Sequence, residues 1–236
     1  MLIRIDKMLS NMGFGSRKQV KELVKYGAVQ VNGVVVKDSA TRINTEEQSV
    51  VVNGEVVEYK EFIYIMMNKP KGVISATEDD YGHTTVLDLL DDYYLHFKPS
   101  CAGRLDIDTE GLMILSNDGQ LIHNIISPKK EIVKKYYCLL DSVITDKDIQ
   151  EFEKGIKLAD GYICLPAKLE KLDDKEAFVY ITEGKFHQVK RMFYARRNNV
   201  RYLKRVQIGG LELDNDLKVG EYRELTQVEI DKIFEQ

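Results

Sequence analysis

The spacing of apolar and polar residues predicts two short helices at the start of the chain. Residues 5–12 place their apolar side chains at i, i+3, i+4 and i+7, as an amphipathic helix does. Ser16 and Gln19 then form the sequence signature of a capping box, which opens a second helix. In that helix Val20 and Val24 share one face and basic residues share another, and Gly27 supplies the stop.

Period-two patterns with turn residues predict strands after these helices. The segments VQVNGVVV (29–36) and VVVNGEVV (50–57) each read as two short strands around Asn-Gly, the strongest local signal for a hairpin. The segment FIYIMMNKPKG (62–72) reads as an apolar strand that ends at Lys69 and Pro70.

The rest of the chain mixes helical and strand patterns without strict βαβ alternation. We predict strands over 112–116, 134–140 and 177–185, and helices over 84–90, 121–125, 145–154, 186–197 and 226–236. This order indicates an α+β fold, in which a mixed, largely antiparallel sheet is flanked by helices.

Composition places the chain among ordinary soluble proteins. Its 236 residues are 44% hydrophobic, enough for a sizeable core in one or two domains. No apolar run approaches the roughly 20 residues of a membrane helix, and the first residues lack a secretory signal, so we expect a cytoplasmic protein without a membrane partner. Cys101, Cys138 and Cys164 lie far apart, which favours reduced thiols over disulfides or zinc.

Basic residues are concentrated in two regions, although the net charge is −4. Residues 1–45 contain eight basic and three acidic residues, and residues 185–205 contain eight basic residues and no acidic one. Such concentrated positive charge on an acidic protein predicts surfaces that bind a polyanion, namely RNA or DNA. In the first region the predicted contacts are Arg4, Lys7, Arg17, Lys18, Lys21 and Lys25.

Residues 103–119, GRLDIDTEGLMILSNDG, crowd four acids around Arg104. They resemble the start of a calcium-binding EF-hand loop, but the twelfth position, which must be Glu, is Asn117. We therefore expect no metal there. A solvated turn and one functional carboxylate held by Arg104 both remain open interpretations.

The first 58 residues resemble a known RNA-binding fold. The order of helix, capped basic helix and hairpin, with the segment SRKQVKELVKYGAVQVNGVVV, resembles the S-four-type domain first known in a small-subunit ribosomal protein. The resemblance implies an RNA-binding domain over 1–58, a linker over 59–62 and a second domain over 63–236.

Four further segments resemble the pseudouridine synthases that carry an S-four-type domain and modify ribosomal RNA. They are NKPKGVIS (68–75), GRLDIDTEGLMILSNDG, KKYY (134–137) and EGKFHQVKRMF (183–193), the last most similar to bacterial enzymes acting on 16S rRNA. The resemblance implies a pseudouridine synthase domain, no cofactor or metal, and a monomer. It also implies that Asp106 is catalytic, Tyr136 (with Tyr137 adjacent) is the active-site tyrosine, and Lys190, or else Arg191, pairs with the aspartate.

The chemistry of such a reaction fits these residues. Isomerisation of uridine needs one ionised carboxylate and no redox group, and a cation such as Arg104 or Lys190 would favour the charged form of Asp106. A target base must leave the RNA stack, and an aromatic face such as Tyr136 would recover part of that cost. In this domain the predicted RNA contacts are Lys69, Lys71, Lys185, His187, Gln188, Arg191, Arg196 and Arg197, with Arg201, Lys204 and Arg205 as further phosphate contacts.

Two alternative functions remain. One keeps the same chemistry but moves the target to 23S rRNA. A protein that only binds RNA during ribosome assembly would explain the basic regions without any reaction at Asp106.

Overall fold

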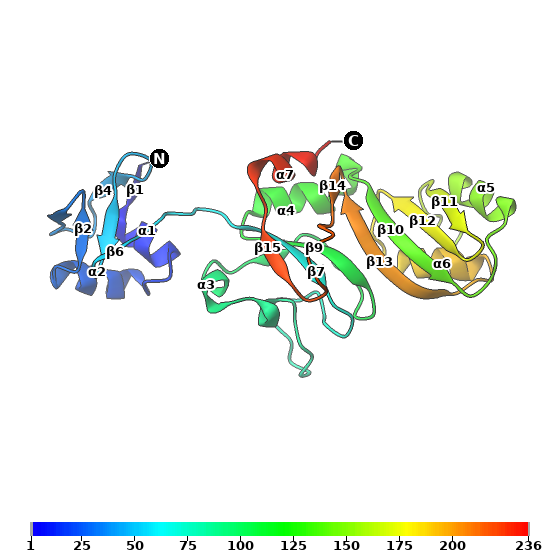
Figure 1. Ribbon diagram of the computed structural model, residues 1–236, viewed down its shortest axis with the longest axis horizontal. Coiled ribbons are helices and arrows are strands. Elements are labelled where there is room, and N and C mark those ends of the chain that lie inside the picture. Colours follow the sequence, from blue (N-terminus) through cyan, green and yellow to red (C-terminus); the bar gives the residue numbers. More distant parts are fainter. Residues whose placement is uncertain (1, 236) are drawn as a thin grey trace. The chain divides into compact units, whose positions relative to one another are not determined.

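The computed structural model describes residues 2–235, which form two compact units (Figure 1). The first unit comprises residues 2–63 together with Asp91–Lys98, and the second comprises Tyr64–Leu90 and residues 99–235. Within these described residues, no helix is both long and apolar enough to cross a membrane.

The first unit contains small antiparallel sheets and short helices. Its elements are β1 (Leu2–Arg4), α1 (Ile5–Asn11), α2 (Arg17–Lys25), β2 (Val29–Val31), β3 (Val34–Val35), β4 (Arg42–Asn44), β5 (Val50–Val52), β6 (Glu55–Val56) and α3 (Asp92–Leu95). Strand β1 pairs with β4, and four strands form a sheet in the order β3-β2-β5-β6. The apolar faces of α1 and α2 pack with these strands in one core.

The capping box and both hairpin turns are confirmed. The backbone N–H of Ser16 donates to Gln19 Oε1 at 2.7 Å, and the N–H of Gln19 donates to Ser16 Oγ at 3.4 Å. Each hairpin turns through an Asn-Gly pair, at 32–33 and 53–54, in which both residues have positive φ. Glycine and asparagine tolerate this backbone conformation better than other residues, which is why the pairs are a strong signal.

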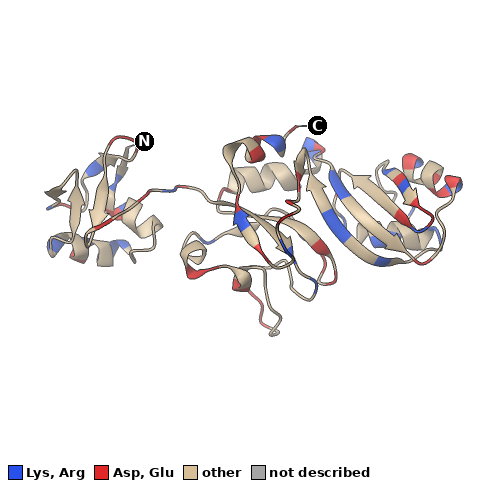
Figure 2. Ribbon diagram, in the orientation of Figure 1, with Lys and Arg blue, Asp and Glu red and all other residues tan. Residues whose placement is uncertain are grey.

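Helix α2 exposes its basic side as the pattern predicts. Val20 and Val24 are buried in the core, whereas four basic residues of the helix are exposed. These residues are Arg17, Lys18, Lys21 and Lys25. Figure 2 shows Lys and Arg in blue along the ribbon of this helix. By contrast, Arg4 donates two hydrogen bonds to Asp6, so its charge is already paired.

Replacing Arg17, Lys18 and Lys21 by Gln should weaken RNA binding and leave the chemical step intact. Each phosphate contact that is lost should reduce the slope of log affinity against log salt by about 0.7 to 0.9. Titrating RNA at several salt concentrations measures this slope, and a matched triple change at Lys147, Lys154 and Lys175, which are exposed in the second unit, should not alter it. An unchanged slope in the first variant would mean that α2 does not touch RNA.

The second unit is built on a nine-stranded sheet. The strands are β7 (Tyr64–Lys69), β8 (Ser100–Cys101), β9 (Glu110–Ser116), β10 (Lys134–Leu140), β11 (Lys168–Asp173), β12 (Glu176–Ile181), β13 (Val200–Ile208), β14 (Leu211–Glu212) and β15 (Tyr222–Glu224). The main path is β11-β12-β10-β13-β9-β7-β15, with β8 beside β9 and β14 beside β13. Among the paired strands of residues 2–235, only β9 and β13 run parallel, which confirms a mixed, largely antiparallel sheet.

Helices cover this sheet and bury its apolar side chains. They are α4 (Gly119–Ile126), α5 (Asp146–Lys154), α6 (Gln188–Ala195) and α7 (Gln227–Lys232), with short 3-10 helices at Leu87–Leu89 and Pro128–Lys130. Figure 1 shows α4 and α7 beside each other, and their apolar residues share a core with Leu112 and Ile114 of β9. On α5 and α6, Phe152 and Phe193 pack with ring centroids 5.0 Å apart.

Strand β13 is absent from the sequence prediction, which treats residues 185–205 chiefly as a basic surface. The structure places Val200–Ile208 in the middle of the sheet, between β10 and β9. Arg205, predicted as a phosphate contact, is only 3% exposed, and its Nε donates to the carbonyl of Leu112 at 2.7 Å. Its guanidinium therefore joins two strands of the sheet, while its contact with phosphate stays a prediction.

Candidate active site

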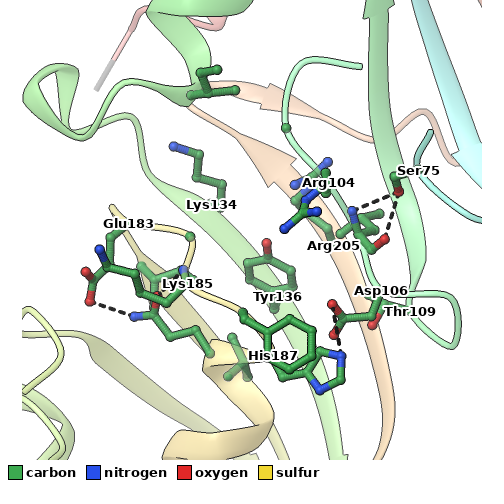
Figure 3. A pocket seen from close by; sticks show the side chains of 18 of the residues that line it. Ser75, Arg104, Asp106, Thr109, Lys134, Tyr136, Glu183, Lys185, His187 and Arg205 are labelled. Atoms are coloured by element: carbon green, nitrogen blue, oxygen red, sulfur yellow. Dashed lines mark hydrogen bonds and ion pairs between the residues drawn. The ribbon is translucent and has the colours of Figure 1, made fainter. Parts of the chain in front are cut away.

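The second unit contains a cavity of about 890 Å³ at the end of β10, beside the loop that precedes β9 (Figure 3). All four segments that stand out in the sequence contribute to its wall. The lining includes Ser75, Arg104, Asp106, Thr109, Lys134, Tyr136, Glu183, Lys185, Phe186, His187 and Arg205. Residues far apart in sequence thus converge on one hollow, as expected for a binding or catalytic site.

The loop that carries Asp106 is held by neighbouring backbone and side-chain groups. The hydroxyl of Ser75 donates to the carbonyl of Leu105 at 2.7 Å and accepts from its N–H at 3.0 Å. The N–H of Gly72 donates to the carbonyl of Ile107 at 2.7 Å, and the N–H of Thr109 donates to the carbonyl of Asp106 at 3.0 Å. The carboxylate of Asp106 therefore projects from a fixed turn.

Lys69, at the end of β7, supports the same loop from within the core. It is fully buried, and its Nζ donates to the carbonyls of Pro70, Asp106 and Thr109 at 3.0, 3.2 and 2.9 Å. Burial lowers the pKa of Lys69 to about 8, although nearby acids oppose the shift. The prediction that Lys69 contacts RNA is wrong, because its amine is engaged inside the protein.

The burial of Lys69 predicts a pH-dependent difference in stability. Its pKa falls from 10.5 to about 8 on folding, so between these values the unfolded chain binds more protons and the folded state gains stability as pH rises. Relative to a Lys69→Met variant, the wild-type free energy of unfolding should rise by about 2 kcal/mol between pH 8 and pH 10. Urea unfolding of both proteins measures this difference. A difference that stays constant or falls with pH would contradict the assignment.

Two basic side chains, from Lys190 of α6 and from His187 just before it, face the carboxylate of Asp106. Lys190 Nζ lies 3.1 Å from Asp106 Oδ2 and also binds Asp108, while His187 Nε2 lies 3.7 Å from Asp106 Oδ1. Partial burial raises the pKa of Asp108, but the hydrogen bond and charge of Lys190 outweigh that effect and leave it below its ordinary value. The side chain of Asp106 is 25% exposed and that of Asp108 53%, so Asp106 is the more enclosed of the two.

Arg104 does not form the predicted ion pair with Asp106. Across residues 2–235 it forms no ion pair with Asp106, and its side chain lines the cavity instead (Figure 3). Arg191, the alternative to Lys190, binds Asp160 and not Asp106. The structure therefore places Lys190 in the position expected of the cation that partners the aspartate.

Adjacent tyrosines of β10 point to opposite sides of the sheet. Tyr136 is 8% exposed and lines the cavity between Asp106 and Lys134 (Figure 3). Tyr137 lies against Phe178 and Tyr202 on the other side, and its hydroxyl donates to Glu176 at 2.8 Å. Of the two tyrosines, Tyr136 alone is positioned to meet a ligand in the cavity, because neighbouring residues of a strand alternate in direction.

Glu183 and Gln188 have structural partners at the edge of the cavity. Glu183 accepts hydrogen bonds from the hydroxyl of Tyr162 at 2.6 Å, the N–H of Leu165 at 2.8 Å and the side chain of Gln188 at 2.8 Å. Gln188 is only 4% exposed but lines the cavity, so its contact with RNA stays a prediction. His187, next to it, has a φ of 48° and stacks on Phe186 with ring centroids 3.8 Å apart.

Several other predicted RNA contacts are paired with acids from distant segments. Arg196 binds Asp148, and Arg201 binds Asp141. Three others make no ion pair within the part of the chain that the structure describes, namely Lys71, Lys185 and Arg197. In the first unit, Lys7 is exposed. The basic region is therefore less available to a polyanion than its charge count suggests.

The arrangement suits reaction at a carboxylate. An enclosed acid beside two basic groups and an aromatic face can act as a nucleophile or base on a planar ligand. Within residues 2–235 no cluster of three or more His, Cys, Asp or Glu side chains could hold a metal ion. Ser75, Lys134, Glu183 and Phe186 lie within the four segments that form the site, although no sequence pattern singles them out.

Comparison with known proteins supports the same interpretation of the chain. Residues 63–195 match the family described as RNA pseudouridylate synthase, and residues 3–49 match the S4 domain. A Bacillus subtilis protein named as an uncharacterized RNA pseudouridine synthase is 50% identical over 232 residues, 97% of each chain. Ribosomal small subunit pseudouridine synthase A of Escherichia coli is 38% identical, over 97% of this chain and 98% of its own. A crystal structure of a pseudouridylate synthase, 38% identical, superposes with a TM-score of 0.69 over 98% of this chain and 99% of that one.

Proposed function

The chain belongs to the RNA pseudouridylate synthase family, and on that premise we propose that it converts one uridine of 16S ribosomal RNA to pseudouridine with Asp106 as the catalytic residue. The observation that carries this proposal is the position of Asp106. Its carboxylate lies at the wall of a cavity of about 890 Å³, 3.1 Å from Lys190 Nζ.

The reaction itself requires little beyond such a carboxylate. The bond between uracil N1 and ribose C1′ breaks, a bond between uracil C5 and C1′ forms, and one proton moves from C5 to N1. Atoms and electrons balance without an oxidant, reductant or metal. Asp106 supplies the carboxylate oxygen that reacts with the target nucleotide, and Lys190 Nζ, 3.1 Å from that carboxylate, holds it in position.

Tyr136 is proposed to hold the target base while its glycosidic bond changes. A uridine must leave its helix to reach an enclosed carboxylate, which costs a few kcal/mol, and stacking on an aromatic ring returns roughly 1 to 3 kcal/mol per base. Because Tyr136 lines the cavity beside Asp106, one base can contact both. The S4 domain, with the exposed basic side of α2, is proposed to bind the surrounding RNA.

The choice of 16S rRNA rests on relatives that are named small-subunit synthases and align over nearly the whole chain. The resemblance to this family is the ground on which we also propose that the enzyme acts as a monomer. The test is to incubate the purified protein with 16S rRNA, 23S rRNA and assembling small subunits, and to map carbodiimide-resistant uridines. A new pseudouridine in 16S rRNA is expected. Modification only of 23S rRNA would move the target, and modification of neither would favour a protein that only binds RNA.

A further inference from the structure

The cavity continues beyond the residues assigned to the reaction. Asp106 lies on one side of Tyr136, and in the view of Figure 3 the amine of Lys134 lies on the other side. Sites that enclose a whole drug-sized ligand measure about 300 to 1,000 Å³, and this cavity, at about 890 Å³, is near the upper end. It therefore has room for more of an RNA strand than one everted base.

Lys134 faces this cavity because of its place in β10. Lys134 and Tyr136 are two residues apart on one strand and so share a side of the sheet, and both line the cavity. Lys135 points to the opposite side, where its Nζ lies 4.0 Å from the ring centroid of Phe178 and 5.4 Å from that of Tyr180. Two neighbouring lysines thus occupy unrelated environments.

The amine of Lys134 is enclosed but lacks a counterion. Its Nζ donates to the carbonyl of Ile125, at the end of α4, at 3.1 Å, which leaves two N–H groups for another acceptor. Within residues 2–235 no carboxylate forms an ion pair with Lys134 or with Arg104, although both line the cavity. Burial, together with the charge of Arg205, lowers the pKa of Lys134 to about 8.

The acidic residues that line the cavity do not neutralise the positive charges of Lys134 and Arg104. Only Asp106 and Glu183 among the lining residues carry a carboxylate, and Asp106 is already paired with Lys190. Glu183 is 5% exposed, and three donors satisfy its oxygens. A half-buried ammonium without a counterion is costly, so a negatively charged ligand group next to Lys134 would be favoured.

We propose that Lys134 forms a phosphate subsite that binds an RNA backbone phosphate flanking the target uridine. The inference rests on the proposed function, because RNA is the ligand that carries a phosphate next to every base in the cavity. With the base on Tyr136 and its ribose at Asp106, a phosphate at Lys134 fixes the strand at a second point. The nucleotide can then be positioned across the cavity rather than pivoting on the tyrosine ring.

The test compares Lys134→Met, Lys134→Arg and the matched control Lys135→Met in the full-length protein. Affinity for a 16S rRNA fragment that the wild type binds is measured from 50 to 300 mM KCl, with urea unfolding to verify that each variant is folded. Lys134→Met should bind about 10- to 100-fold more weakly, as expected for loss of a charge-assisted hydrogen bond. The slope of its log affinity against log salt concentration should become shallower by about 0.7 to 0.9, the value of one phosphate contact. Lys134→Arg should retain the slope, and Lys135→Met should match the wild type.

RNA carrying one uncharged methylphosphonate beside the target uridine identifies the phosphate directly. The wild type should lose affinity for one such RNA, whereas Lys134→Met should lose nothing further. Weaker binding with an unchanged salt slope would mean that Lys134 contacts a neutral group, and it would overturn the subsite. Equal loss of slope in Lys134→Met and Lys135→Met would also overturn it. Pseudouridine formation by the wild type, measured in the same samples, tests the proposed function separately.

Discussion

Replacing Asp106 by Asn should abolish pseudouridine formation while leaving RNA binding within a few-fold of the wild type. Asn has nearly the same shape but supplies no ionised oxygen, so the reacting group is lost and the loop that carries it is kept. We expect a loss of at least about 10³-fold in the single-turnover rate, near the upper part of the range for removal of an essential catalytic group. Carbodiimide mapping of the target uridine measures the rate, and a titration with labelled RNA measures affinity.

Asp108→Asn is the matched control for this experiment. Asp108 also binds Lys190, but its side chain is 53% exposed against 25% for Asp106. Its replacement should change the rate by less than about tenfold, because an exposed ion pair contributes little. Equal losses in the two variants would contradict the assignment of Asp106, and full activity in Asp106→Asn would remove the proposed mechanism altogether.

A large loss of stability is expected from Gly111→Ala. Gly111 has a φ of 105°, and a Cβ added to it would lie 2.2 Å from the carbonyl oxygen of Arg205 and 2.8 Å from its nitrogen. These are backbone atoms of β13, so they cannot move aside as a flexible side chain can. Backbone strain costs about 1 to 3 kcal/mol on its own, and the overlap adds to it, so we expect the free energy of unfolding to fall by more than about 3 kcal/mol. Urea unfolding measures the change.

Gly119→Ala provides the comparison for Gly111→Ala. Gly119 begins α4, and nothing lies within 4 Å of a Cβ placed there. Alanine favours a helix over glycine by up to about 1 kcal/mol, so this variant should be as stable as the wild type or slightly more stable. If Gly111→Ala unfolded within 1 kcal/mol of the wild type, β9 and β13 could not approach as closely as described.

Local patterns predict most elements of the fold, because each has a signal within a few residues. The capping box of α2, both Asn-Gly hairpins and strands β7, β9 and β10 are confirmed. The S4 domain and the synthase family are confirmed as well. Strand β13 could not be found in this way, since Arg201, Lys204 and Arg205 interrupt its apolar residues and its pairing partners are distant in sequence.

Charge is the property that the sequence predicts least well at the site. Lysine is almost never fully buried, so the burial of Lys69 has no local signal. Acids that neutralise the basic region come from elsewhere in the chain, as Asp148 does for Arg196 and Asp106 for Lys190. A count of charges along the sequence does not reveal such partners, because they lie in distant segments. The motifs did, however, lead to Asp106, Tyr136 and Lys190, which the structure brings to one cavity or its edge.

The position of β13 has a consequence for synthesis of the chain. It lies between β10 and β9, yet it is translated after both, so a nascent chain has two unsatisfied strand edges until about residue 208 leaves the ribosome. Such edges invite pairing with other chains. Insertion of β13 between β10 and β9 also brings together segments nearly a hundred residues apart in sequence. The entropic cost of this pairing makes the insertion slow. The cavity can therefore form only late in folding. Fragments truncated before β13 should aggregate rather than retain partial activity.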